Sequence, residues 1–382
     1  MSSIQKLHSA EYGESPAAVV SAPGVITLMG EFSDLCDGYA ISGSLSQTVE
    51  VAVSKRSDNS LRFYSADLDE RKRTTIPNLK YRREDRWANY IKGVLYELFR
   101  RNYPFKGLNI TVKGSIPQKV GLKSSTALCT ASALAVKELH EFEIDDTQLI
   151  QSIYFAETSF MQMKSRLVDI MTMLYSRPDQ LLLFDLHTLE HSYIPFIFSD
   201  AVMLVTESDI PPFPIRDELL YREEACQAGF GEVREKIPGG ILREITSSDI
   251  KGVAEHLPEE QKKFCLFVLL ESKITREAAH ALENKDSFAY GKLMNRLQTG
   301  LRDLFEVSCP EVDWLTKRAI ETHGCYGSKM IGPGFGGCTI SLMKESAVPE
   351  YTAKLEEYEH IFGFHPAWFI YKPAGSAQIL KN

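Results

Sequence analysis

Short apolar runs separated by turn residues mark the first half of the chain. Such runs, rich in Val, Ile, Leu and Phe and bounded by Gly, Pro, Asn or Asp, predict β-strands. They lie at residues 19–31, 47–55, 61–65, 107–113, 181–185 and 202–206. Between these runs, apolar residues recur every three or four positions, which is the spacing of one helix face. This spacing, together with an Ala-rich composition in the second case, predicts helices over residues 87–101, 124–141 and 146–162.

The second half of the chain is mostly helical in pattern from residue 216 to residue 323 and then becomes mixed. The mixed part contains a glycine-rich segment, a strand at 339–343, a helix over 348–362 and a last strand at 367–371. Strands followed by helices and then by mixed elements predict an α+β fold.

The length of the chain indicates more than one domain. A chain of 382 residues is too long for one compact core, so we expect two domains that face a cleft. The boundary is expected near residues 194–200, just before the Pro-rich stretch 210–214. This gives an N-terminal domain over 1–198 and a C-terminal domain over 199–382.

Composition and charge narrow the possible partners. The formal net charge is −8, which argues against nucleic acid and anionic membranes, because both require a basic face. No apolar stretch approaches the ~20 residues needed to span a bilayer. The first twenty residues include Glu11 and Glu14 and do not resemble a signal peptide. Seven scattered cysteines indicate free thiols in a reducing compartment, so we expect a cytoplasmic protein.

The first of three glycine-rich segments covers residues 22–34. A predicted strand delivers the carboxylates of Glu31 and Asp34 just past Gly30. Clustered carboxylates at a strand end can accept hydrogen bonds from the hydroxyls of a polyol. The alternative is a turn that carries two solvated acids.

The second segment covers residues 116–128. Gly121 leads into Ser124 and Ser125, which open the Ala-rich helix. The N–H groups and the dipole at a helix start attract phosphate, and a serine hydroxyl there can ligate Mg²⁺. The order of residues is not that of a Walker A loop. The alternative is that Ser124 is only the N-cap of the helix.

The third segment covers residues 327–338. Four of the six residues from 332 to 337 are glycine, including Gly334 and Gly336. Glycines allow positive φ angles and a close approach of the backbone to a ligand. The alternative is a tight turn before the strand that follows.

In this order and at these separations, the three segments resemble the signature motifs of the GHMP kinases, the family of galactokinase, homoserine, mevalonate and phosphomevalonate kinases. Within the family the chain is most similar to galactokinases, and the similarity covers nearly its whole length. It extends to residues 87–94, 288–294, 301–303, 307–313 and 358–377. The resemblance implies an N-terminal domain like domain 2 of ribosomal protein S5, a ferredoxin-like C-terminal domain, and ATP, Mg²⁺ and a monosaccharide or related polyol as ligands.

The resemblance also implies roles for individual residues. Asp169, at the matching distance from Ala156–Phe160, falls on the catalytic aspartate, and Ser125 and Glu157 fall on the Mg²⁺ ligands. The implied sugar-binding residues are Glu31, Phe32, Asp34 and Tyr221. The implied ATP-binding residues are Lys119, Gly121, Lys123, Ser124, Ser125, Gly334 and Gly336. An acid within the apolar run 167–171 is poorly placed for a solvated role, which supports the assignment of Asp169.

Several expected sugar-site residues are replaced. Val25 stands where the family carries an arginine or lysine, and Phe32 where galactokinases carry histidine. Ile170 replaces a glutamine, and Leu219 replaces a tyrosine, although Tyr221 is near. Such replacements remove hydrogen-bond partners for sugar hydroxyls.

New cations accompany these losses. Arg166 replaces a glycine three residues before Asp169, and we expect it to form an ion pair within the site and to act as a second catalytic residue. Lys119 and Lys123 either supply positive charge to the site or lie on a solvated loop surface.

Two functions therefore stay open. The first is ATP-dependent phosphorylation of a monosaccharide, at the anomeric hydroxyl as in galactokinase, with galactose not necessarily the acceptor. The second is a weakly active or inactive ligand sensor that retains the kinase fold. The oligomeric state, monomer or homodimer, stays open as well.

Overall fold

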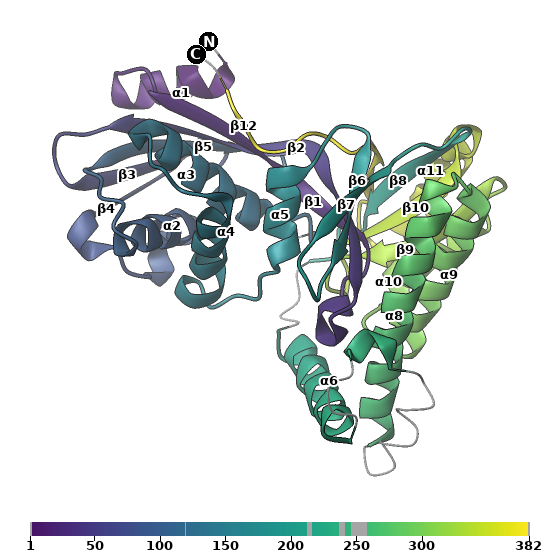
Figure 1. Cartoon of the computed structure of the whole chain (residues 1–382). Coiled ribbons are helices and arrows are strands. Elements are labelled where there is room, and N and C mark those ends of the chain that lie inside the picture. The colour runs from purple at the N-terminus through teal and green to yellow at the C-terminus, as the bar shows by residue number, and fades with distance from the viewer. Residues whose placement is uncertain (1, 119, 212–215, 237–240, 246–257, 381–382) are drawn as a thin grey trace.

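The computed structural model describes residues 2–118, 120–211, 216–236, 241–245 and 258–380. It contains an eight-stranded sheet and a four-stranded sheet, each with helices packed against it (Figure 1). The predicted α+β fold is therefore confirmed.

The first sheet has the order β12-β1-β2-β5-β3-β4, with β6 paired to β2 and β7 paired to β6. Its strands are β1 (Ala18–Met29), β2 (Tyr39–Lys55), β3 (Ser60–Ser65), β4 (Glu70–Thr75), β5 (Leu108–Gly114), β6 (Gln180–Asp185), β7 (His191–Pro195) and β12 (Gln378–Ile379). The helices of this half are α1 (Ser3–Tyr12), α2 (Ala88–Arg100), α3 (Ser124–His140), α4 (Asp146–Phe155) and α5 (Leu167–Tyr175). Helices α3 and α5 both pack on β1 and β2.

The second sheet has the order β11-β8-β10-β9 and is antiparallel throughout. Its strands are β8 (Ala201–Glu207), β9 (Cys325–Ile331), β10 (Cys338–Lys344) and β11 (Ala367–Tyr371). The helices of this half are α6 (Arg216–Lys236), α8 (Glu259–Glu283), α9 (Ser287–Asp303), α10 (Pro310–Ile320), α11 (Val348–Ala353) and α12 (Leu355–Phe362). Short helical turns lie at η1 (Ser33–Cys36), η2 (Ile76–Asn78), η3 (Arg83–Asp85), η4 (Ala156–Phe160), η5 (Leu242–Glu244) and η7 (Glu345–Ala347).

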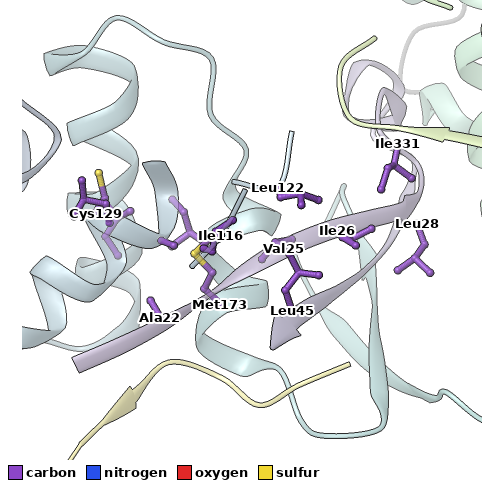
Figure 2. Close-up of a cluster of buried hydrophobic side chains, with 14 of the residues drawn as sticks. Ala22, Val25, Ile26, Leu28, Leu45, Ile116, Leu122, Cys129, Met173 and Ile331 are labelled. Atoms are coloured by element: carbon purple, nitrogen blue, oxygen red, sulfur yellow. The ribbon is translucent and has the colours of Figure 1, made fainter. Parts of the chain in front are cut away.

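The hydrophobic core explains why β1 is almost continuously apolar. This strand is buried along nearly its whole length because helices cover it while β2 and β12 flank it. Val25, Ile26 and Leu28 from β1 belong to the same core as Leu45 from β2 and Leu122 from the loop before α3 (Figure 2). A strand buried on both faces reads as a continuous apolar run rather than an alternating one.

The structure corrects several predicted boundaries. β2 begins at Tyr39 rather than at residue 47, because its first residues pair with β6. The helix predicted over 146–162 changes at Ala156 into the π-helical turn η4, and the one predicted over 348–362 is divided at Lys354. The third glycine-rich segment begins as the strand β9.

The strands of the second sheet all lie after residue 198, but β12 returns to the first sheet, where Ile379 pairs with Val20. The division into 1–198 and 199–382 stays a prediction. Within the described ranges, no helix combines the length and apolarity needed to cross a bilayer.

Candidate active site

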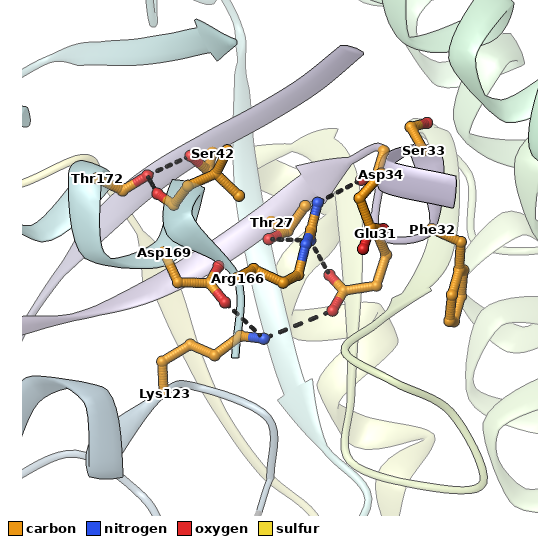
Figure 3. A network of polar contacts seen from close by, with 12 residues as sticks. Thr27, Glu31, Phe32, Ser33, Asp34, Ser42, Lys123, Arg166, Asp169 and Thr172 are labelled. Atoms are coloured by element: carbon orange, nitrogen blue, oxygen red, sulfur yellow. Dashed lines mark hydrogen bonds and ion pairs between the residues drawn. The ribbon is translucent and has the colours of Figure 1, made fainter. Parts of the chain in front are cut away.

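The site forms where the end of β1, the loop before α3 and the start of α5 meet. The main-chain N–H of Val25 donates to the carbonyl of Leu122 at 3.2 Å, which holds the loop beside the strand. Asp169 lies in the first turn of α5. One turn further, the hydroxyl of Thr172 lies 2.6 Å from that of Ser42 on β2, so α5 is fixed to the first sheet (Figure 3).

Four charged side chains, here called the ionic wall, converge at this place: the buried Glu31, Arg166 and Asp169 and the partly buried Lys123. Lys123 Nζ lies 3.1 Å from Asp169 Oδ2 and 3.6 Å from Glu31 Oε1 (Figure 3). Arg166 Nη1 lies 3.7 Å from Glu31 Oε2, and Arg166 Nη2 donates a hydrogen bond to the Gly30 carbonyl at 2.9 Å. Arg166 therefore pairs within the site as expected, but with Glu31, whereas Lys123 pairs with Asp169.

The charges of the ionic wall stabilise one another. Burial lowers the pKa of Lys123, but the carboxylates of Asp169 and Glu31 outweigh burial and raise it above its usual range. For Arg166, Asp34 and Glu31 likewise outweigh burial and raise the pKa. Burial raises the pKa of Glu31, but Lys123 and Arg166 more than offset it, so the pKa is lowered. Both cations and the Glu31 carboxylate are thus charged at neutral pH.

The ionic wall lines a pocket of about 710 Å³. The apolar part of the lining, here called the apolar wall, consists of Phe32, Met163, Leu219, Leu220 and Pro333. The remaining lining is polar and comprises Thr126, Thr158, Gln162, Lys164, Ser165 and Glu223. A largely apolar pocket with a few convergent polar groups is typical of a small-molecule site.

Four polar atoms around this pocket are buried and have no hydrogen-bond partner within the described residues. They are Glu31 Oε2, Asp34 Oδ1, Arg166 Nε and Asp169 Oδ1. An unmet polar atom costs roughly 1–3 kcal/mol of folding free energy, so several at one place indicate a polar ligand.

A larger hollow of about 850 Å³ lies elsewhere, along β3 and β4. Its lining includes Arg71, but this side chain already pairs with Glu11 at 2.7 Å and with Asp69 at 3.1 Å. None of the three glycine-rich segments contributes to its lining. We therefore place the functional site at the ionic wall despite the smaller volume.

The start of α3 differs from a simple capped helix. The N-cap residue is Lys123, with φ 62°, and Ser124 is the first helical residue. The alternative in which Ser124 is only an N-cap is therefore wrong. The solvated-surface alternative for Lys123 is wrong too, because its side chain is 20% exposed and points to Asp169 and Glu31.

Oxygen atoms gather beside the start of α3. Glu157, from η4, accepts hydrogen bonds from the hydroxyls of Thr126 and Ser165, and burial raises its pKa. The neighbouring Ser125 hydrogen-bonds with Tyr90. Hard oxygen donors of this kind fit Mg²⁺, which needs few protein ligands when phosphates and water supply the rest. Within the described residues, there is no cluster of three or more His, Cys, Asp or Glu that would hold a metal without such help.

The glycines of the third segment are required by its backbone. Gly334 has φ 113°, and a Cβ there would lie 2.7 Å from the carbonyl oxygen of Val307. Gly336 has φ 133°, and its nearest neighbours are side-chain atoms of Ile210 at 3.3 Å or more. Gly121, with φ 85°, lies against the third segment, where its Cβ would meet Gly332 Cα at 3.4 Å. The second and third segments are thus in contact.

Some predicted site residues do not reach the pocket. Tyr221 is 47% exposed and donates to Glu260 Oε2 at 2.6 Å, so it points to the surface of α6 and α8. The ring of Phe32 packs on Phe305, with centroids 4.5 Å apart, although the residue still lines the pocket. Lys119 lies outside the described residues.

The sequence reasoning missed Glu271 on α8 and Lys329 on β9. Glu271 is 1% exposed and accepts hydrogen bonds from the Phe32 N–H at 2.8 Å and the Ser33 hydroxyl at 3.3 Å. Burial raises its pKa to about 7 and lowers that of Lys329 to about 8. The sequence contained one signal for Glu271: it is an acid that shares the apolar helix face of Phe267 and Ile274, which lie four residues before it and three after it.

Comparisons with known proteins agree with this geometry. The GHMP kinases N terminal domain family matches residues 89–177, and the GHMP kinases C terminal family matches residues 278–360. The galactokinase galactose-binding signature matches residues 6–55. The chain is 31% identical to the galactokinase of Homo sapiens over 377 residues, which cover 97% of this chain and 94% of that protein. The chain belongs to the GHMP kinase family.

Within this family the chain is similar to galactokinases. It is 31% identical to the galactokinase of Roseiflexus sp. (strain RS-1) over 350 residues, 91% of this chain and 89% of that one. The crystal structure of Lactococcus lactis galactokinase complexed with galactose has the same fold, with a TM-score of 0.92 at 22% identity over 98% of both chains. The protein is a galactokinase-like sugar kinase, a phosphotransferase, as the sequence predicted.

Proposed function

We propose that the protein transfers the γ-phosphoryl group of ATP to a hydroxyl of a monosaccharide or related polyol, as galactokinases do at the anomeric position. The observation that carries this proposal is Asp169. It is 3% exposed, its Oδ2 is held by Lys123, and its Oδ1 is buried without a partner in the described part of the chain. A carboxylate oxygen kept free beside a phosphate-binding helix start suits the acceptance of a hydroxyl proton.

The ligand-binding roles follow from position. Glu31 and Asp34 each have one buried oxygen without a hydrogen-bond partner among the described residues, and these oxygens would accept hydrogen bonds from hydroxyls of the acceptor. Gly121, Ser124 and Gly336 would bring main-chain N–H groups to the phosphates, since positive φ angles and a helix start leave such groups available.

Mg²⁺ would be held by Ser125 and Glu157. When bound, it would neutralise part of the charge of the phosphates. The protein's own contribution is to present these oxygens: η4 places Glu157 against Thr126, at the start of α3. The family and the donor set support this assignment.

The acceptor is proposed to be a sugar with an apolar substituent or a deoxy position, and galactose is proposed to be a poor substrate. The apolar wall offers Leu219, Leu220 and Met163 to one part of the acceptor, whereas the ionic wall offers hydrogen-bonding atoms to another. A polar hydroxyl pressed against aliphatic carbon loses its hydrogen bonds to water, which costs about 1–3 kcal/mol.

A coupled assay of ADP release tests this proposal. The panel contains galactose, its 6-deoxy and 2-acetamido derivatives, other hexoses, pentoses and uronic acids. We expect at least one deoxy or acetamido sugar to exceed galactose in kcat/KM by about tenfold or more. Galactose ahead of all other compounds would refute the proposed preference. ATP and sugar binding without any turnover would instead identify a ligand sensor.

A reducing, cytoplasmic location is proposed on the cysteines. All seven lie in the described part of the chain and are free thiols, five of them buried. Free thiols persist where disulfides do not form.

A further inference from the structure

We infer that Lys123 supplies the positive charge that Asp169 requires in the transfer step, in place of a cation at position 25. This inference rests on the proposed function and assigns to Lys123 a role at the carboxylate rather than at the nucleotide. Lys123 is a positioning residue, because it acts on the reacting atoms through Asp169.

Position 25 cannot serve this purpose in the present chain. Val25 is 0% exposed and belongs to the apolar core, near Leu45 and Leu122 (Figure 2). Its main-chain N–H is bonded to the carbonyl of Leu122, the residue immediately before Lys123. The backbone of Lys123 therefore lies close to that of position 25. The positive charge that is missing from β1 is present in the loop before α3, which is adjacent in space but far away in sequence.

The backbone of Lys123 is shaped for this position. Its φ of 62° lies in the left-handed region, which is unfavourable for a residue other than glycine. Such strain persists where surrounding contacts repay it, and here the ammonium contacts Asp169 at 3.1 Å and Glu31 at 3.6 Å. The lysine joins a carboxylate from α5 to one just after β1.

The other cations of the pocket are engaged elsewhere. Arg166 contacts Glu31 and the Gly30 carbonyl. Lys164 is 43% exposed and pairs with Glu223. Lys123 is thus the one cation within 4 Å of Asp169 in the described part of the chain.

The chemistry assigns separate tasks to the two oxygens of Asp169. The acceptor hydroxyl gives its proton to Oδ1, its oxygen forms a bond to the γ-phosphorus, and the bond from that phosphorus to the β–γ bridging oxygen breaks, leaving ADP. Lys123 keeps its own protons throughout. Bound to Oδ2, it fixes the carboxylate so that Oδ1 faces the substrate, and its charge offsets negative charge beside the transferred group.

The test compares three variants with the wild type on the best acceptor of the sugar panel: Lys123→Met, Lys123→Ala and, as a control on the exposed surface of α10, Lys317→Met. We expect kcat of Lys123→Met to fall about 10²–10³-fold while the Kd for ATP, measured by calorimetry, changes less than about threefold. Lys317→Met should keep kcat within about threefold, because Lys317 is 72% exposed and pairs only at the surface with Glu321. Addition of ethylammonium should restore part of the turnover of Lys123→Ala, because the truncated side chain leaves room for a small cation.

Lys123→Arg keeps the test decisive if the neutral variants unfold. It retains the charge with altered reach, so we expect kcat below that of the wild type with an unchanged Kd for ATP. If the wild type turns over and the kcat of Lys123→Met is within about threefold of the wild-type value, the inference is wrong but the proposed function stands. Weaker ATP binding at unchanged kcat would also overturn the inference and make Lys123 a nucleotide ligand. Absence of turnover in the wild type would instead refute the proposed function, and the inference with it.

Discussion

The ionic wall and the hydrophobic core beside it both exclude most solvent but are built differently. In the core, Ile26 and Leu45 are each 1% exposed and meet other apolar side chains (Figure 2). In the wall, Asp169 is 3% exposed, yet one of its oxygens has no partner within the described residues (Figure 3). Buried apolar side chains that contact one another stabilise the fold. Buried polar atoms without a hydrogen-bond partner cost stability, and they are typical of a site that binds a ligand.

The comparison predicts its largest effect at Asp169. Asp169→Asn keeps the shape of the side chain but removes the negative charge, so kcat should fall by about 10³-fold or more. Binding of ATP, followed by calorimetry, should persist. Asp179→Asn is a suitable control, because Asp179 is exposed just beyond α5 and its φ of 57° is one that Asn tolerates well. Near-normal turnover of Asp169→Asn would remove the residue from the mechanism.

A core residue should show the opposite behaviour. Leu45→Ala leaves a cavity beside β1, so the free energy of unfolding should fall by about 2–5 kcal/mol. Turnover per folded molecule should stay within about threefold, since no polar atom of the site is changed. Urea unfolding and kinetics on one preparation measure both quantities. Leu68→Ala, at a site 41% exposed, should change stability by only about 0.5 kcal/mol.

The smallest predicted effect concerns the pH dependence of stability. Burial raises the pKa of Glu271 from 4.5 to about 7, so the folded protein binds more protons than the unfolded chain between these values. Stability should therefore decline as pH rises through this window, by up to about 1.4 kcal/mol per pH unit. Glu271→Gln keeps an acceptor for the Phe32 N–H and should remove this decline.

Unfolding free energies at half-unit pH steps from about 4.5 to 7 measure the effect. Glu277→Gln, on the exposed side of α8, serves as the control and should retain the wild-type slope. An unchanged slope in Glu271→Gln would show that Glu271 does not titrate in this range. Lys329 does not affect this measurement, because its pKa is lowered from 10.5 to about 8. Between these two values the unfolded chain binds more protons, so stability should rise with pH there.

The sequence predicted most of the fold because periodicity is a local property. The runs that became β1, β3, β5 and β6 and the helices α2 and α3 were visible from residue types alone. Strand β4 (Glu70–Thr75) was not predicted, because its residues are all polar and the strand forms by pairing with β3. Pairing of that kind depends on another segment and leaves no local pattern.

The candidate site was predictable in its members but not in its contacts. Arg166 was expected to form an ion pair within the site, but the sequence did not show that its partner would be Glu31. Lys123 reaches Asp169 because the loop before α3 is bonded to β1, a contact between segments far apart in sequence. Loss of a charge at Val25 and gain of one at Lys123 was the only sequence signal of this arrangement.

The pairing of β12 with β1 has a consequence for how the protein is made. Val20 is paired with Ile379, a separation of more than 350 residues, so the first sheet obtains strand β12 only long after β1 has left the ribosome. Until then one edge of β1 stays open, and open strand edges invite pairing with other chains. Loss of residues 378–379 should therefore raise aggregation during synthesis, while the pocket, which is built from other residues, stays intact.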